Sequence, residues 1–144
     1  MRDWRESPYR RTPSGNAVTH SHREQCVRQF IAAYNAFDVE GMVALLAPDI
    51  RFENYSGEAL TAAATGIDEF RQLAERSKAL FSQREQRITS LELRDRSVIV
   101  GIHYRGRLAA DVPNGPAAGT VPELDGTSEY FFGGEGISRL IDRS

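Results

Sequence analysis

Residues 30–49 read FIAAYNAFDVEGMVALLAPD and join two segments with helical periodicity. In the first segment, apolar side chains recur at three- and four-residue steps and share one helical face: Cys26, Val27, Phe30, Ile31, Tyr34 and Phe37. Asp38 has the position of an N-cap for the second helix, which we expect to end near Pro48. The segment therefore predicts a helical hairpin followed by a strand.

Upstream of this hairpin, we expect the first helix to begin at Ser21, because Ser21 and Glu24 have the spacing of a capping box. Residues 1–20 combine prolines and arginines with no apolar period, which is typical of a flexible N-terminal arm. The alternative is a basic arm that contacts a partner, since aromatic residues lie among its arginines. We expect residues 21–144 to form a single domain.

Downstream, Ile50, Phe52 and Asn54 alternate with polar or charged residues, which predicts a strand with one mainly apolar face. A loop of small residues is expected next, and the helical period returns over residues 66–83. This third helix is expected to shield one side of a sheet.

The second half of the chain has the pattern of antiparallel strands, expected at residues 88–93, 98–105, 126–132 and 137–142. Residues 111–119 are rich in proline and glycine and predict a loop at the rim of the sheet. The order of elements predicts an α+β fold, in which three helices of the N-terminal half pack on the concave face of a curved antiparallel sheet and enclose a pocket.

Composition limits the function classes. A chain of 144 residues has room for one domain, and a net charge of −2 disfavours a general electrostatic attraction to nucleic acid. The longest apolar stretches, residues 42–47 and 98–102, are too short to span a membrane. The single cysteine, Cys26, forms no intramolecular disulfide, and charged residues interrupt the N-terminus where a signal segment would be apolar. We therefore expect a cytoplasmic protein with no nucleic-acid or membrane partner.

The helical hairpin with its Asp-x-Glu-Gly step at residues 38–41, and the strand after Pro48-Asp49, resemble the opening of the nuclear transport factor 2-like superfamily, in its SnoaL-like and ketosteroid-isomerase-like branch. The resemblance covers about residues 22–142. It implies a cystatin-like cone with a hydrophobic pocket between helices and sheet, commonly in a homodimer formed through the outer face of the sheet. It does not imply one activity.

The catalytic sets of this superfamily transfer only in part. Where the resemblance puts the tyrosine and the two aspartates of the steroid isomerases, this chain has Phe30, Asn54 and Ser128, so steroid isomerisation is disfavoured. For the limonene-epoxide-hydrolase type, Asn54 and Asp142 match an asparagine and the final aspartate of the set. Phe52 stands in place of the tyrosine of that set, and Ile102 and Tyr104 stand in place of its arginine and its other aspartate. This chain therefore lacks the charged pair of that mechanism.

Four residues are the candidate catalytic groups: Asn54, Asp142, Tyr34 and Tyr104. Asn54 either orients a ligand or water from the inward face of its strand or caps the end of that strand. A desolvated Asp142 would act as acid or base, and the alternative is a solvated residue near the C-terminus. Each tyrosine hydroxyl would polarise a carbonyl or stabilise an oxyanion, or it would be a core residue with a satisfied tip.

A further set is expected to line the pocket and bind substrate: Phe30, Phe52, Ile102, Ser128, Tyr130 and Asp111. For Asp111 the alternative is an aspartate that organises a turn. We expect no metal, because His20 and His22 lie close together but no cysteine or carboxylate completes a ligand set at a recognisable spacing. We also expect no cofactor, since no glycine-rich phosphate loop follows a strand.

Two hypotheses of function remain open. The first is a homodimeric enzyme that acts on a small, largely apolar molecule by cofactor-free proton transfer or water addition, as an isomerase, cyclase or hydrolase. The second is a non-catalytic domain that binds a ligand or a partner. The dimer rests on the resemblance and on apolar residues at outward positions of the sheet, namely Ile99, Phe131 and Ile141. His103 shares that outward face, which places it away from the pocket.

Overall fold

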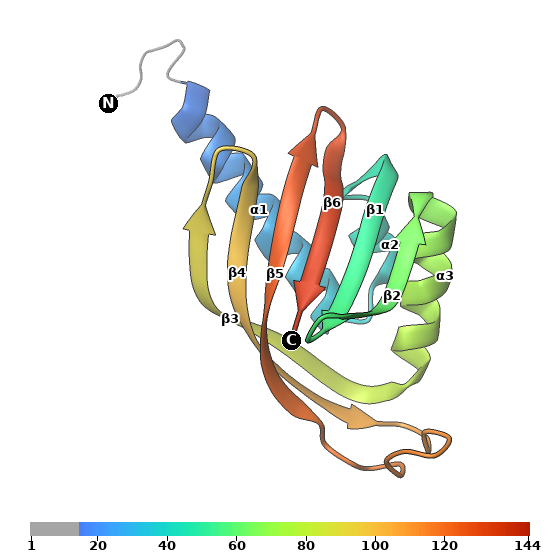
Figure 1. Ribbon diagram of the computed structural model, residues 1–144. Helices are drawn as coiled ribbons and strands as arrows, with labels where there is room; N and C mark the ends of the chain where they lie inside the picture. The colour runs from blue at the N-terminus through green and yellow to red at the C-terminus, as the bar shows by residue number, and fades with distance from the viewer. Residues whose placement is uncertain (1–14) are drawn as a thin grey trace.

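The computed structural model describes the backbone of residues 15–144 and the side chains from residue 20 onward. The elements, in chain order, are α1 (Gly15–Asn35), α2 (Val39–Val43), β1 (Leu46–Ser56), β2 (Ala59–Thr65), α3 (Gly66–Ala79), β3 (Phe81–Leu93), β4 (Ser97–Leu108), β5 (Glu123–Gly133) and β6 (Gly136–Arg143). Figure 1 shows the strands as one strongly curved, unclosed sheet, with the helices on its concave side. The expected α+β cone with three helices is confirmed.

The six strands follow the order β2-β1-β6-β5-β4-β3. All neighbouring pairs are antiparallel except β1 and β6, which run parallel. The expectation of a wholly antiparallel sheet is therefore wrong at this one place. A parallel pair needs a long crossover connection, and here the rest of the domain supplies it.

The helical hairpin forms where the sequence predicted it. Asp38 is the N-cap of α2, and its carboxylate accepts a hydrogen bond of 2.9 Å from the backbone N–H of Gly41. The turn between the helices places Phe37 at a φ of +59°, in the left-handed region. Helix α2 ends at Val43 and β1 starts at Leu46, so the strand already includes Pro48.

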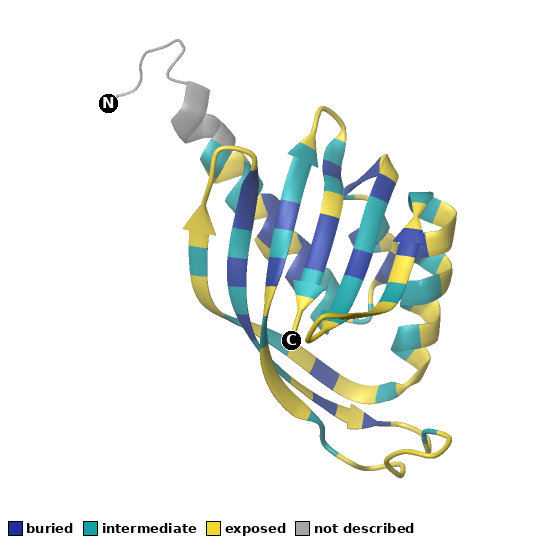
Figure 2. Cartoon of the chain, in the orientation of Figure 1, coloured by how far each residue is buried: buried dark blue, intermediate teal, exposed yellow. Residues whose placement is uncertain are grey.

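Buried residues occur on the helices and on the central strands of the sheet (Figure 2). Val27 from α1, Ile50 from β1, Val98 and Val100 from β4 and Ile137 from β6 are all 0% exposed. Full burial of one such side chain stabilises the fold by about 1.5–3 kcal/mol. The core thus ties α1 to strands from both halves of the chain.

Several predicted boundaries are wrong. Helix α1 starts at Gly15, so Ser21 lies inside it and is not a capping residue. Residues 59–65 form the edge strand β2 rather than a loop, because pairing with β1 overrides the weak strand preference of small side chains. Helix α3 ends at Ala79, and β3 starts at Phe81, seven residues before the predicted strand at residue 88.

The predicted flexible arm, residues 1–20, and the basic arm that was its alternative fall mainly on residues 1–14, which lie outside the described residues. The last part of the predicted arm, from Gly15, belongs to α1. The division into an arm and one domain stays a prediction for residues 1–14.

The turn between β5 and β6 contains a glycine that combines a positive φ with a close backbone contact. Gly136 has a φ of +123°, and a Cβ added there would lie 2.7 Å from the carbonyl oxygen of Leu45. The same carbonyl accepts a 3.0 Å hydrogen bond from the N–H of Ile137, so neither partner can move freely. The turn thereby attaches β6 to the segment before β1.

We expect Gly136→Ala to lower the free energy of unfolding by about 2 kcal/mol or more, since it adds backbone strain to a steric clash. Gly134→Ala is the matched control, because a Cβ at that position of the same turn meets no atom within 4 Å. Urea unfolding of both variants checks this. Equal stabilities of the two variants would contradict the assignment.

Candidate functional site

A cavity of about 680 Å³ lies between the helices and the concave face of the sheet. Most of its wall is apolar or aromatic: Phe30, Met42, Phe52, Phe70, Leu73, Ala74, Leu80, Phe81, Ile102, Tyr130 and Leu140. A volume of this order is typical of pockets for small molecules. Phe30, Phe52, Ile102, Ser128 and Tyr130, which the sequence analysis assigned to a pocket, all line it.

Aromatic rings from different elements pack edge to face in this wall. The centroid of Phe30 lies 5.6 Å from that of Tyr130, and the centroid of Phe52 lies 5.8 Å from that of Phe70. Such pairs restrict ring motion and add about 0.5–1.5 kcal/mol beyond burial. The apolar wall therefore has a defined shape.

Asp142 lies on β6 and lines the cavity, in register with Asn54 on β1 and Ser128 on β5. The Ser128 hydroxyl donates a 2.6 Å hydrogen bond to Oδ1 of Asp142. Desolvation by burial raises the pKa of Asp142 to about 6, although the bond from Ser128 acts in the opposite direction. Asp142 can thus both take up and release a proton close to neutral pH.

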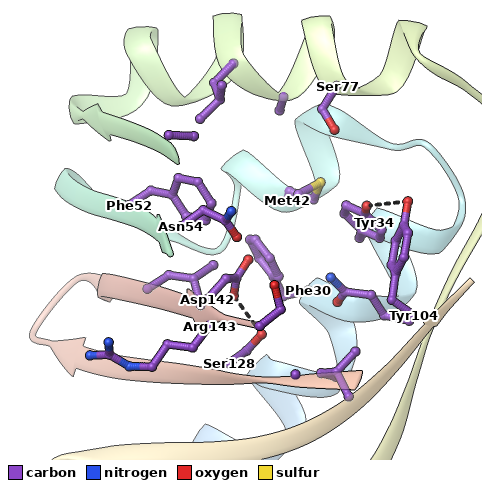
Figure 3. Close-up of a pocket in the computed structure, with 18 of the residues that line it drawn as sticks. Phe30, Tyr34, Met42, Phe52, Asn54, Ser77, Tyr104, Ser128, Asp142 and Arg143 are labelled. Carbon is purple, nitrogen blue, oxygen red and sulfur yellow. Dashed lines mark hydrogen bonds between the residues drawn. The ribbon is translucent and has the colours of Figure 1, made fainter. Parts of the chain in front are cut away.

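Asn54 faces Asp142 across the junction of β1 and β6 (Figure 3). Its Nδ2 donates a 2.8 Å hydrogen bond to the Thr61 hydroxyl, and that hydroxyl donates to the backbone oxygen of Asn54 at 3.1 Å. The side-chain amide is therefore held by β2, the strand that the sequence analysis missed. Its position beside a carboxylate suits a group that orients a ligand or water.

Tyr34 and Tyr104 form a second polar group in the cavity wall. Tyr34 comes from α1 and Tyr104 from β4, and their hydroxyl oxygens lie 3.5 Å apart (Figure 3). Burial raises the pKa of both hydroxyls, and the charge of Asp142 further opposes ionisation of Tyr34. Both tyrosines therefore keep their protons at neutral pH. The Tyr34 hydroxyl donates to the Tyr104 hydroxyl, which leaves the proton of Tyr104 for a ligand.

Asp111 is the expected substrate-binding residue that the structure places elsewhere. It lies in the loop between β4 and β5, outside the lining of the cavity, and its Oδ1 accepts a 2.8 Å hydrogen bond from the N–H of Ala118. The expectation that it lines the pocket is wrong, because its carboxylate organises the loop.

His103 faces away from the cavity, as its position in the strand pattern predicts. Its ring nitrogens lie 2.7 Å from carboxylate oxygens of Asp125 and Glu123. Hydrogen bonds to Asp125 and then to Glu123 raise the pKa of the imidazole. His103 therefore belongs to a charged cluster on the outer face of the sheet.

Gln86 is a cavity residue that the sequence pattern did not predict, because the third helix was expected to extend to residue 83 and the next strand to begin at residue 88. Gln86 lies on β3 opposite Tyr104. Its Oε1 is buried and has no hydrogen-bond partner among the described residues. Residues 84–87 are all polar or charged, so no alternation of apolar and polar side chains marked this part of the strand.

Within residues 20–144, no group of three or more histidine, cysteine, aspartate or glutamate side chains has the arrangement of a metal site. Among the helices of the described part of the chain, none is long and apolar enough to cross a membrane.

A family model described as the SnoaL-like domain matches residues 27–140. No curated protein matches the chain. The family match agrees with the resemblance drawn from residues 30–49.

Solved structures share the fold. A protein from Xanthomonas campestris, whose assignment as a polyketide cyclase is provisional, is 18% identical with a TM-score of 0.76 over 87% of this chain and 91% of that chain. An uncharacterised cystatin-fold protein from Novosphingobium aromaticivorans is 22% identical, with a TM-score of 0.66 over 82% of this chain and 94% of that one. TerC, crystallised with polyporic acid, is 13% identical with a TM-score of 0.66, over 83% and 88% of the two chains.

The raised pKa of Asp142, about 6, has a consequence for stability. An aspartate in the unfolded chain has a pKa of about 3.9, so the folded chain binds this proton more tightly. The resulting stability is present below about pH 4 and is lost as the pH rises through about 6.

We therefore expect Asp142→Asn to stabilise the protein by about 2 kcal/mol at pH 8 and to change its stability little at pH 4. Urea unfolding at the two pH values measures this. Asp49→Asn, which removes an exposed carboxylate from β1, is the control for the loss of one negative charge. The same stability change at both pH values would show that the Asp142 carboxylate is not desolvated.

Proposed function

The chain belongs to the SnoaL-like domain family, and from this premise we propose that it binds a small, largely apolar molecule in the cavity and catalyses a cofactor-free proton transfer on it. Addition of water by the same groups is the related reaction. The main support is the Asp142 carboxylate, which lies in an apolar cavity with a pKa of about 6. The small-molecule complex of a structural neighbour, TerC with polyporic acid, agrees with this use of the fold.

In the proposed reaction, ionised Asp142 removes a proton from a carbon next to a carbonyl group of the ligand. The electron pair of the broken C–H bond moves to the carbonyl oxygen, which becomes an enolate oxygen. The hydroxyl of Tyr104 donates a hydrogen bond to that oxygen, and the hydroxyl of Tyr34 donates to Tyr104. Return of the proton from Asp142 to another atom of the ligand completes the reaction and restores the carboxylate.

Ser128 and Asn54 prepare Asp142 for this role. The bond from Ser128 fixes Oδ1, and within the described residues no group donates a hydrogen bond to Oδ2, which leaves that oxygen for the ligand proton. Asn54, held by Thr61, sits beside the carboxylate and orients the ligand or a water molecule.

A second candidate function is binding without catalysis. It is supported by the hydrogen bonds that the polar groups already make: Asn54 is paired with Thr61, and Asp142 is paired with Ser128. Polar side chains that are already paired within the protein can line a binding site without acting on the ligand.

We also propose that the protein is a cytoplasmic homodimer that pairs through the outer face of its sheet. On this face Ile99 and Ile141 flank Glu129, and Phe131 lies next to them under the guanidinium of Arg139 at 5.8 Å. This mixture of apolar and charged side chains suits an interface between two copies. The cytoplasmic location is supported by the free, buried thiol of the single cysteine.

Deuterium exchange tests the catalytic proposal directly. 1-Indanone and 2-tetralone carry exchangeable protons next to a carbonyl group, and mass spectrometry in heavy water reports the exchange. We expect the protein to accelerate exchange with a rate that rises as the pH passes about 6. Asp142→Asn is expected to slow the catalysed exchange by about 100-fold or more.

Ser128→Ala is the informative companion variant, because loss of its hydrogen bond raises the pKa of Asp142 further and moves the midpoint of the pH profile upward. If Asp142→Asn exchanges these ketones as fast as the unmodified protein, Asp142 is not the base. Ligand retention in native mass spectra, with no catalysed exchange, would favour the binding candidate.

Light scattering after size exclusion tests the dimer. At micromolar concentration we expect twice the chain mass of 16.1 kDa, and Ile99→Asp is expected to give the monomer by burying a charge in the interface. Leu93→Asp is the control, since Leu93 is 37% exposed and pairs with Val98 of the core face. A monomeric unmodified protein would contradict the proposed interface.

A further inference from the structure

Arg84 places a buried positive charge behind the tyrosine pair of the cavity. It lies on β3 and is only 7% exposed. Its Nε donates a 3.0 Å hydrogen bond to the backbone oxygen of Tyr34, near the end of α1. The proposed reaction has not used this residue.

The guanidinium packs against two aromatic rings. Its central carbon is 3.7 Å from the ring centroid of Tyr34 and 4.5 Å from that of Phe37. Contacts of this kind stabilise a cation, and they fix the guanidinium against the ring whose hydroxyl faces the cavity. Arg84 therefore acts on the cavity through Tyr34.

No aspartate or glutamate among the described residues forms an ion pair with Arg84. Arg28, Arg71 and Arg94, by contrast, do have close carboxylates, and they form these ion pairs at the exposed surface. A buried cation without a counter-ion is costly, and ring faces and one carbonyl offset only part of that cost. An anion bound close by would complete the compensation.

The positive charge also reaches the two hydroxyls. Burial is the largest influence and raises the pKa of both tyrosines, while Arg84 lowers the pKa of each. The charge of Arg84 thus favours the anionic form of the tyrosine oxygens. It favours a negatively charged ligand oxygen bound to these hydroxyls for the same electrostatic reason.

We propose that the Tyr34–Tyr104 end of the cavity selects ligands with an enol- or phenol-type oxygen, and that Arg84 lowers the energy of its anionic form. Arg84 is then a positioning and specificity-determining residue, which acts through the tyrosines and does not touch the ligand. The inference rests on the proposed function and narrows its substrate class to molecules with an acidic oxygen.

The charges around this end are consistent with such a ligand. Titratable groups line the cavity from α1 (Tyr34), α3 (Arg76), β4 (Tyr104), β5 (Tyr130) and β6 (Asp142 and Arg143). Among them Asp142 carries the negative charge near neutral pH, and a negative Asp142 opposes a second negative charge in the cavity. When the ligand gives its proton to Asp142, one negative charge moves from the carboxylate to the ligand oxygen, toward Arg84.

Binding of 4-nitrophenol tests the inference, because its neutral and anionic forms have different absorbance spectra. Asp142→Asn serves as the parent protein, because the Asp142 carboxylate would otherwise titrate in the same pH range as the phenol of the probe. We expect the bound probe to have a lower pKa than the free probe. Addition of Arg84→Met should reduce the preference for the anion over the neutral phenol by about tenfold to a hundredfold.

Two variants serve as controls. Arg87→Met removes the same charge from an exposed position on β3, opposite His103 on the outer face, and should leave the preference unchanged. Arg84→Lys keeps the charge and should retain part of the preference. If Arg84→Met does not fold, Tyr104→Phe replaces it, since loss of a donating hydroxyl should also weaken binding of the anion more than that of the phenol.

An equal loss of affinity for both forms of the probe in Arg84→Met would show a structural role and overturn the inference. A parent protein that prefers the neutral phenol, or binds neither form, would overturn it too. Neither result decides the proposed function, because catalysed exchange of the ketones, which carry no acidic oxygen before reaction, is measured separately.

Discussion

The parallel pairing of β1 with β6 is the contact on which the site depends. It joins an early strand to the last one, and at the end of the pair Gly57 and Tyr55 exchange backbone hydrogen bonds with Ser144 at 2.8 and 3.0 Å. Without this pairing the sheet would divide between β1 and β6, since they are neighbours in its order. The same pairing brings Asn54 beside Asp142, so one set of backbone hydrogen bonds both joins the sheet and assembles the polar centre of the cavity.

The apolar wall controls the chemistry of the groups within it. Desolvation raises the pKa of Asp142 to about 6 and keeps the tyrosine hydroxyls protonated. The same scarcity of water makes the buried charge of Arg84 costly and its effect on neighbouring oxygens strong. The negative charge of Asp142 on β6 and the positive charge of Arg84 on β3 thus act on the cavity from different strands. Their field favours the movement of negative charge from Asp142 toward Arg84 during a reaction.

Local patterns predicted the parts of the fold that depend on neighbouring residues. The N-cap at Asp38 and the alternation of Phe52 and Asn54 needed no tertiary information, because capping and strand parity are properties of a few adjacent residues. The wrong predictions concern features that depend on contacts between residues far apart in the sequence or on the fold of a loop. The strand at residues 59–65 exists through its pairing with β1, and the carboxylate of Asp111 turned to a backbone N–H of its own loop.

By itself, the sequence determined the fold class, because helical periodicity and strand parity are properties of consecutive residues, and residues 30–49 carried the resemblance to the family. It left open whether Asp142 reaches the pocket. Only the tertiary structure decided that Asp142 meets Asn54, that Tyr34 meets Tyr104, and that Arg84 is buried behind them. These pairs come from segments separated by many residues, and their contacts depend on strand register and sheet curvature. Desolvation depends on the same packing, so the protonation of the site is a property of the assembled cone and not of any local motif.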